Sequence, residues 1–345
     1  MSKTPKTPDL QQVINEAVNE FAKGNASAAK AIISRLDAES QEQAWLWIAG
    51  AFYFGKSLPK QPDAAFEIWN RLADSGSAWT QNLLGEFYLR GEYLQKSIPI
   101  GIALIEKAAA QNLPVALATL GEIYRLGLPP ILPDFARSLS YMHRAADLGE
   151  TETIVSLAGL YFNGTELEQS FDKAFELNQR AAELGNPKAH YNLGVAYEFG
   201  RGVAIDDLQA FHHYKISAEA GLPLAQHNLG ARFANARGVA QDFDSAVLWY
   251  SRAASQGSVL SLHCLGRLFL TEQGVERNLQ AALGCFILAS EQAHEESARL
   301  AKALSPLLTP TQITHARASA CDFLTKQSVP SARISNASNG DPKTF

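Results

Sequence analysis

The chain has 345 residues, of which 46% are hydrophobic and 19% charged, with a formal net charge of −5 and a pI of about 5.9. This length suits two ordinary domains or one elongated array, and the apolar fraction supplies a sizeable core. The acidic balance, without any local Lys/Arg cluster, excludes a general nucleic-acid binder, which needs a basic stripe.

The first residues, 1–8, are polar and interrupted by Pro5 and Pro8. They lack the apolar core of a signal peptide, and we expect them to be disordered. Residues 9–40 then hold two helices, at about 9–23 and 26–37, which we predict to form an N-terminal helical cap. No apolar run in the chain approaches 18 residues, so no membrane insertion is predicted.

Residues 41–293 contain a repeat that is visible as YNLGVAYEFGRGV at 191–203, HNLGARFANARGV at 227–239 and HCLGRLFLTEQGV at 263–275. Each repeat has one small residue at a fixed place, which we call its anchor. The seven anchors are 35 to 37 residues apart: Gly50, Gly85, Gly121, Ala158, Gly194, Gly230 and Gly266. An aromatic residue follows three positions after every anchor, so an array of about seven repeats is predicted.

Two further series indicate that each repeat contains two helices. Six runs such as AAELG end in a residue suited to a left-handed helix terminus: Gly76, Asn112, Gly149, Gly185, Gly221 and Gly257. Ala293 takes this place in the last repeat, so that helix is expected to end differently. Fifteen positions before the terminators, from the second repeat onward, stand residues that cap helix starts: Ser97, Asp134, Ser170, Asp206, Asp242 and Asn278.

Each repeat is therefore predicted to run as helix A, a loop, helix B and a tight turn. In the sixth repeat helix A covers about 223–234 and helix B about 243–256. Ala225, Leu229 and Phe233 form one apolar face of helix A, and Gly230 beside that face lets helix B approach closely. The expected fold is all-α, an α/α solenoid of two-helix repeats that forms a right-handed superhelix with capping helices at both ends.

After the array, we place C-terminal capping helices at 294–325. The first is HEESARLAKAL at 294–304, and the second begins with Thr309, Pro310 and Gln312, which form a capping-box pattern. Residues 326–345 are rich in Ser, Asn and Pro, and we expect them to be a disordered tail.

The repeat pattern A-x-x-x-L-G-x-x-Y/F-x-x-G-x-G-V-x-x-D-x-x-x-A-x-x-W/Y-Y-x-x-A-A-x-x-G resembles the Sel1-like repeat, a relative of the tetratricopeptide repeat. Residues 189–210 and 242–257 carry the pattern almost completely, whereas repeats one to four depart from it, with RGEYLQKS and GLPPILPD in the loops of repeats two and three. The resemblance implies a scaffold or adaptor for protein complexes, with helix A lining a concave surface that binds a protein or peptide.

No catalytic, cofactor or metal site is predicted. His227 and His263 stand one repeat apart and suggest half of a metal site, but no Cys, Asp or Glu partner is evident, so we interpret them as packing residues in the place of Tyr191. Asp206 and Asp242 are explained as helix caps. We therefore expect a protein that is not an enzyme and needs no cofactor.

The three cysteines are an odd number without C-x-x-C spacing. This pattern fits free thiols in a reducing compartment, and a cytoplasmic location is predicted. Cys264 and Cys285 are interpreted as small core residues.

The exposed side of helix A supplies the candidate residues for protein binding, because side chains there do not fill the core. They are Asn192, Asn228, Arg232 and Arg267. Three tryptophans that the repeat constrains less are alternative anchors for a partner, although core packing is favoured for them: Trp45, Trp47 and Trp79. The alternative functions are an immunity or chaperone-like protein dedicated to one toxin or effector, and an enzyme with an unrecognised site.

Overall fold

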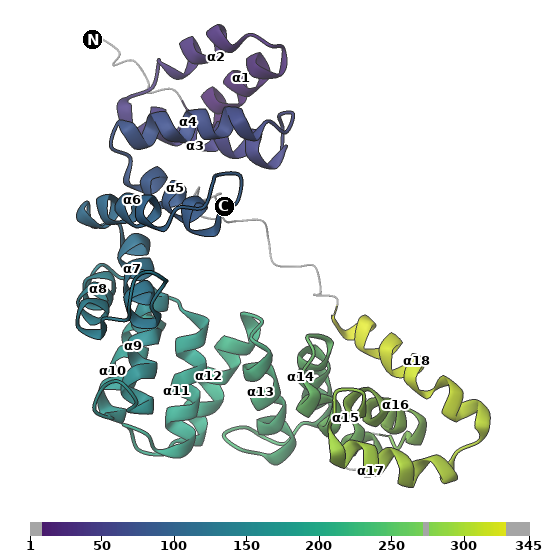
Figure 1. Ribbon diagram of the computed structural model, residues 1–345. Coiled ribbons are helices and arrows are strands. Elements are labelled where there is room, and N and C mark those ends of the chain that lie inside the picture. The colour runs from purple at the N-terminus through teal and green to yellow at the C-terminus, as the bar shows by residue number, and fades with distance from the viewer. Residues whose placement is uncertain (1–8, 272–275, 329–345) are drawn as a thin grey trace, which may run out of the picture. The chain divides into compact units, whose positions relative to one another are not determined.

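The computed structural model describes residues 9–271 and 276–328, where the chain is helical and its only strand-like feature is a β-bridge between Leu128 and Ile131. The chain divides into an N-terminal unit that ends at Glu150 and a C-terminal unit that begins at Thr151 (Figure 1). The expected disordered segment 1–8 lies outside the described residues, as does 329–345.

The N-terminal unit consists, in its described part, of consecutive helix pairs. Its helices are α1 (Leu10–Ala22), α2 (Ala26–Ile33), α3 (Ala38–Phe54), α4 (Pro62–Asp74), α5 (Ala78–Arg90), α6 (Ile98–Ala110), α7 (Pro114–Leu126) and α8 (Phe135–Asp147). Helices α3 and α4, α5 and α6, and α7 and α8 pack together as the A and B helices of three repeats. Helix α1 packs on both α2 and α3.

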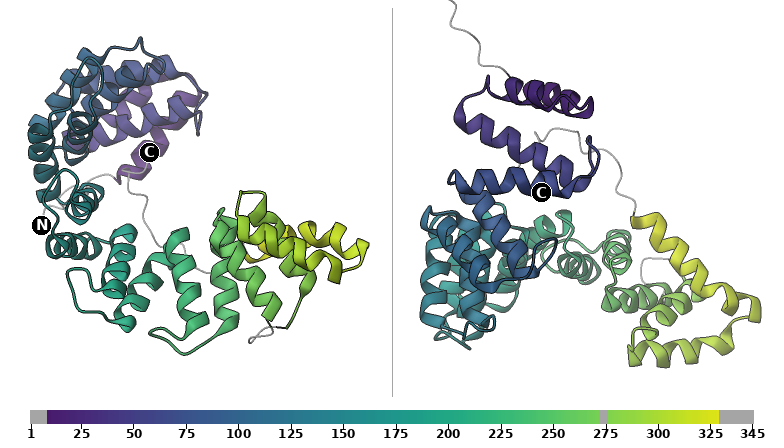
Figure 2. Two further views of the ribbon diagram at one scale, coloured as in Figure 1. Left: turned by 60° about the horizontal axis from the view of Figure 1, so that its bottom comes forward. Right: turned by 45° about the horizontal axis from the view of Figure 1, so that its top comes forward.

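The C-terminal unit continues the same pattern. Its described helices are α9 (Thr151–Asn163), α10 (Phe171–Glu183), α11 (Pro187–Phe199), α12 (Asp207–Glu219), α13 (Pro223–Asn235), α14 (Phe243–Ser255), α15 (Val259–Thr271), α16 (Leu279–Ser290), α17 (Glu295–Leu304) and α18 (Pro310–Ser328). The helices of each pair from α9 to α16 lie side by side (Figure 2). Helices α17 and α18 both pack on α16, and α18 also contacts α14.

The predicted caps begin five of the six B helices concerned. The side chains of Asp134, Ser170, Asp206, Asp242 and Asn278 accept hydrogen bonds from backbone N–H groups of the first helical turn. Ser97 makes no such bond. The capping box of α18 is confirmed. The backbone N–H of Gln312 donates to Thr309 Oγ1 at 3.3 Å, and the backbone N–H of Thr309 donates to Gln312 Oε1 at 2.9 Å.

Two expectations about helix ends are wrong. Ala293 adopts a φ of 63°, so α16 ends through a left-handed residue like the other B helices, despite its Cβ. The amide of His294 donates to the carbonyl of Ala289, just as that of Ser258 donates to Ala253 after α14. The tail is predicted to begin at Lys326, but α18 continues to Ser328.

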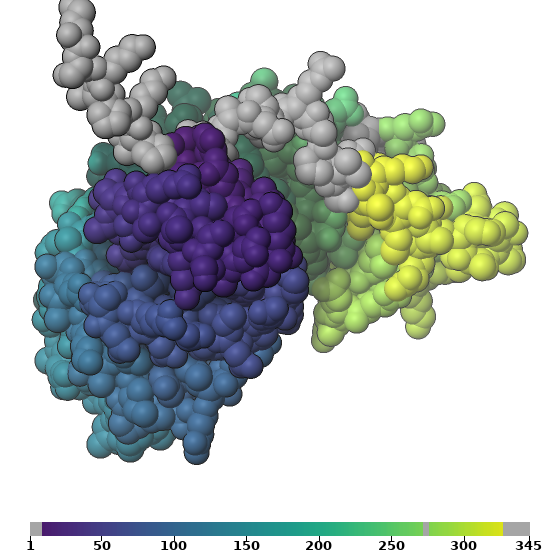
Figure 3. Space-filling model, turned by 90° about the horizontal axis from the view of Figure 1, so that it is seen from above, coloured from purple at the N-terminus to yellow at the C-terminus, as the bar shows by residue number. Residues whose placement is uncertain are grey.

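The anchors act where helices A and B touch. A Cβ on Gly194 would lie 2.7 Å from the ring of Tyr214, so glycine lets the aromatic residue of helix B pack directly on helix A. Repeat four has Ala158 as its anchor, and Asn178 stands where Tyr214 stands in the next repeat. The space-filling view shows the helices of the N-terminal unit packed closely against one another on the face that it presents (Figure 3).

Candidate functional site

Open cavities lie between successive A helices in both units, and the same positions of the repeat line them. The residue two before the anchor contributes in four repeats: Leu83, Asn192, Asn228 and Cys264. The residue one after the anchor contributes in five: Glu86, Gly159, Val195, Ala231 and Arg267. Three of the four residues predicted for binding, Asn192, Asn228 and Arg267, belong to these two series.

The largest of these cavities, about 490 Å³, lies in the N-terminal unit between α3 and α5. We call it the aromatic groove. Trp47 and Tyr53 of α3 and Trp79 of α5 line it, and its deep residues are Trp69 and Phe87. The ring of Tyr53 lies 5.4 Å from that of Trp69 and 5.6 Å from that of Phe87.

The edge of the aromatic groove comes from the loop RGEYLQKS of repeat two. Tyr93 is 60% exposed and its ring lies 5.3 Å from that of Tyr53. Burial, with the charge of Glu92 nearby, raises the pKa of Tyr53 above its ordinary value. Behind these rings the indole N–H of Trp69 is buried and has no acceptor among the described residues.

A second cavity, about 290 Å³, lies in the C-terminal unit between α9 and α11, and we call it the amide cavity. Asn178 from α10 is buried; its amide donates to the carbonyl of Ala174 at 2.8 Å. Its Oδ1 accepts from Asn192 at 3.0 Å. Because asparagine is smaller than the tyrosine found at this place in repeats five and six, the space beside Ala158 stays open.

Arg201 lines the amide cavity and is held by aromatic rings. Its guanidinium lies 4.9 Å from the ring centre of Phe162, 5.3 Å from that of Phe199 and 5.8 Å from that of Phe171. No carboxylate in residues 9–271 or 276–328 forms an ion pair with it. The cavity therefore presents amide groups and a positioned cation together with phenyl rings.

The third cavity, about 190 Å³, lies between α13 and α15 and contains Arg267 and Cys264. Arg267 is exposed, as predicted. Tyr250 and Cys264 are hydrogen-bonded to each other, and burial raises both of their pKa values. Asn228 of α13 is half-buried, and its side chain is hydrogen-bonded to the hydroxyl of Tyr191 on the preceding A helix, α11.

The expected exposure of Arg232 is wrong. Its side chain is only 2% exposed and forms ion pairs with Glu198 at 3.1 Å and with Asp207. Arg237 joins the same two carboxylates, and the hydroxyl of Tyr214 donates to Glu198 at 2.7 Å. The guanidinium of Arg232 holds the pKa of Asp207 below its ordinary value. Arg232 is thus a structural link between repeats five and six, which removes it from the exposed candidates.

The sequence contains a sign of this burial that periodicity within one helix does not reveal. The residue two after the anchor is apolar in every other repeat: Phe52, Phe87, Ile123, Leu160, Ala196 and Leu268. Four of these six are buried, at 7 to 9% exposure: Phe52, Phe87, Ala196 and Leu268. A charged residue at this position must therefore find partners in the neighbouring repeat.

The interpretation of His227 and His263 as packing residues agrees with their contacts. Nδ1 of His227 lies 2.9 Å from the hydroxyl of Ser261, and Nδ1 of His263 lies 2.9 Å from that of Ser297. The ring of His227 on α13 therefore contacts α15, and the ring of His263 on α15 contacts α17. No three His, Cys, Asp or Glu side chains gather as metal ligands in the described part of the chain.

A histidine pair that the sequence did not suggest joins α11 and α12. Nδ1 of His190 lies 3.0 Å from Nδ1 of His213, and Tyr197 stacks on His213 with ring centres 5.6 Å apart. Burial, together with His190 and His212, lowers the pKa of His213 to about 4. Burial therefore favours the neutral form of both imidazole rings.

The three less constrained tryptophans are all half-buried, so none is a fully exposed anchor. Trp47 and Trp79 line the aromatic groove, whereas Trp45 lines a separate cavity beside α2. Within the described residues no helix combines the length and apolar character needed to cross a bilayer.

Comparison with known proteins identifies the repeat. A family model described as Sel1 repeat matches seven segments, residues 47–77, 80–113, 114–150, 154–186, 187–222, 223–258 and 261–294. A curated relative from Neisseria meningitidis serogroup B, an uncharacterised protein, is 32% identical over 92 residues, which are 27% of this chain and 20% of that protein. This chain therefore spans about a fifth of that relative's length.

Two solved structures are similar over most of the chain. One is a protective antigen of uropathogenic Escherichia coli strains that displays an SLR fold, with a TM-score of 0.71 and 20% identity, covering 93% of this chain and 73% of the antigen. The other is a Sel1 repeat protein from Oxalobacter formigenes, with a TM-score of 0.63 and 26% identity, covering 86% of this chain and 90% of that one.

Proposed function

This chain belongs to the Sel1 repeat family, and from that premise we propose that it is a non-catalytic scaffold or adaptor that binds a partner protein or peptide on the surface formed by its A helices. One observation carries the proposal: equivalent positions of helix A line open cavities in both units. A repeat array presents such a surface to a long ligand because each repeat offers the same side of its A helix.

The chemistry of the three cavities suits a polypeptide. The aromatic groove offers Trp and Tyr side chains, which dominate binding energy at many protein interfaces. The amide cavity offers Asn192 and Arg201, which suit backbone carbonyls and acidic side chains. Asn192, Asn228 and Arg267 remain binding candidates, although the amides of Asn192 and Asn228 each already make one hydrogen bond, to Asn178 and to Tyr191.

Site-specific crosslinking tests the surface even while the partner is unidentified. A photoreactive phenylalanine analogue replaces Leu83 or Asn192 on the A helices, or the exposed residues Lys107 and Glu176 on B helices α6 and α10, and each variant is irradiated in cells. We expect the variants at Leu83 and Asn192 to crosslink to the same partner protein. The variants at Lys107 and Glu176 should give no crosslinked product of the same mass.

An adduct that forms equally from Lys107 or Glu176 would contradict binding on the A-helix surface. A purified partner then allows affinity to be measured for Asn192→Ala and Arg201→Gln against Glu176→Gln as the control. We expect each change at the amide cavity to weaken binding by about tenfold, the loss of one interfacial hydrogen bond or ion pair. The alternative function, an immunity or chaperone-like protein, also requires binding on the A-helix surface. It differs only in the identity of the captured partner.

A further inference from the structure

A cavity of about 450 Å³ lies in the N-terminal unit away from the aromatic groove, between α2 and α4. It arises because the N-terminal helix pair stacks unevenly on the first repeat. Helix α1 packs against α3, whereas the short helix α2 packs mainly on α1 and presents only Ala26 and Lys30 towards α4. The volume falls within the range of small-molecule sites in proteins.

The inner wall of this cavity is aromatic. Phe21 lies edge-to-face against Trp45 with ring centres 6.1 Å apart, and against Phe52 at 5.5 Å. Ile68 and Leu72 of α4 add aliphatic surface. The three rings are held in place by one another and by the core beneath them, so the wall exists without a ligand.

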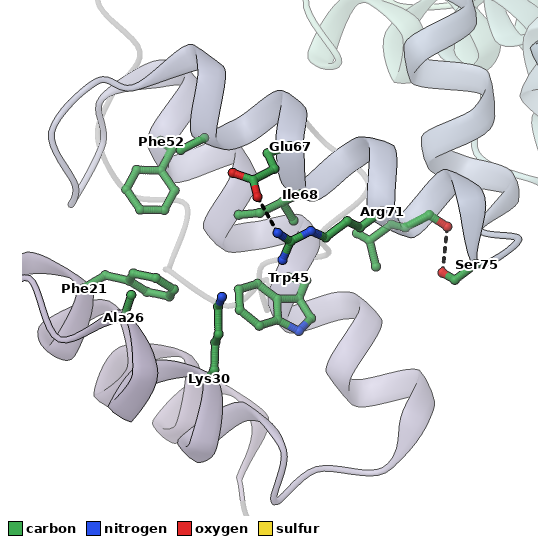
Figure 4. A pocket seen from close by; sticks show the side chains of 11 residues that line it. Phe21, Ala26, Lys30, Trp45, Phe52, Glu67, Ile68, Arg71 and Ser75 are labelled. Atoms are coloured by element: carbon green, nitrogen blue, oxygen red, sulfur yellow. Dashed lines mark hydrogen bonds and ion pairs between the residues drawn. The ribbon is translucent and has the colours of Figure 1, made fainter.

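The mouth of the cavity carries an excess of positive charge. Lys30 projects from α2 between the rings of Phe21 and Trp45 (Figure 4). Glu67 and Arg71 face it from α4, and they neutralise each other in an ion pair. Lys30 has no acidic partner among residues 9–271 and 276–328, so the mouth has a net charge of +1.

We propose that this cavity binds a small hydrophobic carboxylic acid, whose apolar body lies against the three aromatic rings and whose carboxylate lies beside Lys30. The rings supply apolar area that is removed from water on binding. A carboxylate neutralises the net positive charge at the mouth. The ammonium group of Lys30 pairs with it, and Arg71 lies at the same opening. This site is independent of partner binding on the A helices, since α2 and α4 form its mouth.

The test is calorimetric titration of the full-length protein with 2-naphthoate and with its uncharged analogue 2-naphthamide. We expect one naphthoate to bind per chain, about tenfold more tightly than the amide. Lys30→Gln should remove that preference and keep binding of the amide. Lys107→Gln, a lysine on the exposed side of α6, should leave both affinities unchanged.

Ala26→Trp tests the location, because residue 26 is exposed and a large side chain there fills the mouth without entering the core. Its far-UV circular dichroism should match that of the native protein, and binding should be lost. Unchanged binding in this variant, equal affinity for acid and amide, or no binding at millimolar concentration would each overturn the proposal. Tighter binding of N-acetyl-Leu-Phe than of naphthoate would also overturn it, by showing that the occupant is the C-terminus of a partner chain.

Discussion

The ring of Tyr214 lies against Gly194 so closely that a Cβ at position 194 would be 2.7 Å from it. The same relationship recurs between Gly230 and Tyr250, at 2.9 Å, and between Gly266 and Phe286, at 2.6 Å, so in these three repeats the glycine anchor makes room for the ring of helix B. Repeat four shows the converse, since Ala158 is accompanied by Asn178 and by the open amide cavity. The anchor and the facing residue of helix B therefore form one packing unit.

Gly194→Ala should lower the free energy of unfolding by about 1–3 kcal/mol, because the added methyl group forces the ring of Tyr214 to move in a packed interior. Gly159→Ala is the matched control. It lies one residue after an anchor in another A helix, and a Cβ there would meet nothing within 4 Å. The control should be neutral or stabilising, as alanine favours helix. Urea unfolding followed by circular dichroism measures both, and equal effects would refute the packing unit.

Asn178→Tyr should be destabilising alone, by about 1–3 kcal/mol, since the new ring meets the Cβ of Ala158. The double change Ala158→Gly with Asn178→Tyr should recover most of that loss and fill the amide cavity. The coupling between the two changes should therefore be favourable, in the range of about 0.5–3 kcal/mol. A double-mutant cycle in urea tests this, and strict additivity of the two single changes would count against it.

The sequence predicts the local parts of this fold well and the contacts between repeats poorly. Helix caps such as Asp134 and the left-handed terminators depend on residues within a single turn, so the printed sequence is sufficient to place them. Ala293 is an exception to this local prediction, because packing in the array imposes a positive φ on a residue type that disfavours it. The A-helix positions that line cavities follow from the same periodicity, so the sequence places Asn192 and Arg267 at such positions, and their role in binding stays a prediction.

The prediction that Arg232 is exposed is wrong because each A helix has a second buried face, towards the preceding repeat. Its partners Glu198 and Asp207 are 34 and 25 residues away in the sequence, and no pattern within α13 points to them. The cavity beside α2 was also unforeseen, since it depends on how α1 and α2 stack on α3. Both features come from packing between elements, which the hydrophobic period of one helix does not encode.

Arg232→Ala should lower the free energy of unfolding of the C-terminal unit by about 3 kcal/mol, because it leaves Glu198 without its buried partner. This is the low end for a broken buried ion pair, because Arg237 stays paired with Glu198 at 2.9 Å and Asp207 is 41% exposed to solvent. Arg267→Ala, on an exposed arginine of α15, should change stability by no more than about 0.5 kcal/mol. Thermal and urea unfolding of the two variants should therefore differ clearly, and similar curves would show that the ion pairs contribute little.

The histidine pair of α11 and α12 should make stability depend on pH. The pKa of His213 is lowered to about 4, below its ordinary 6.5, so the folded protein keeps this ring neutral while the unfolded chain takes up a proton near pH 6.5. Between pH 6.5 and 4 the unfolded state binds more protons, and the free energy of unfolding must fall as the pH falls.

His213→Gln should flatten this dependence relative to the native protein, whereas His212→Gln, on the exposed side of α12, should change it less. Urea unfolding at pH 7.5, 6 and 5 tests this, because carboxylates that titrate in the same range affect all three proteins alike. Parallel curves for the native protein and His213→Gln would mean that the pKa of His213 is the same in the folded and unfolded states.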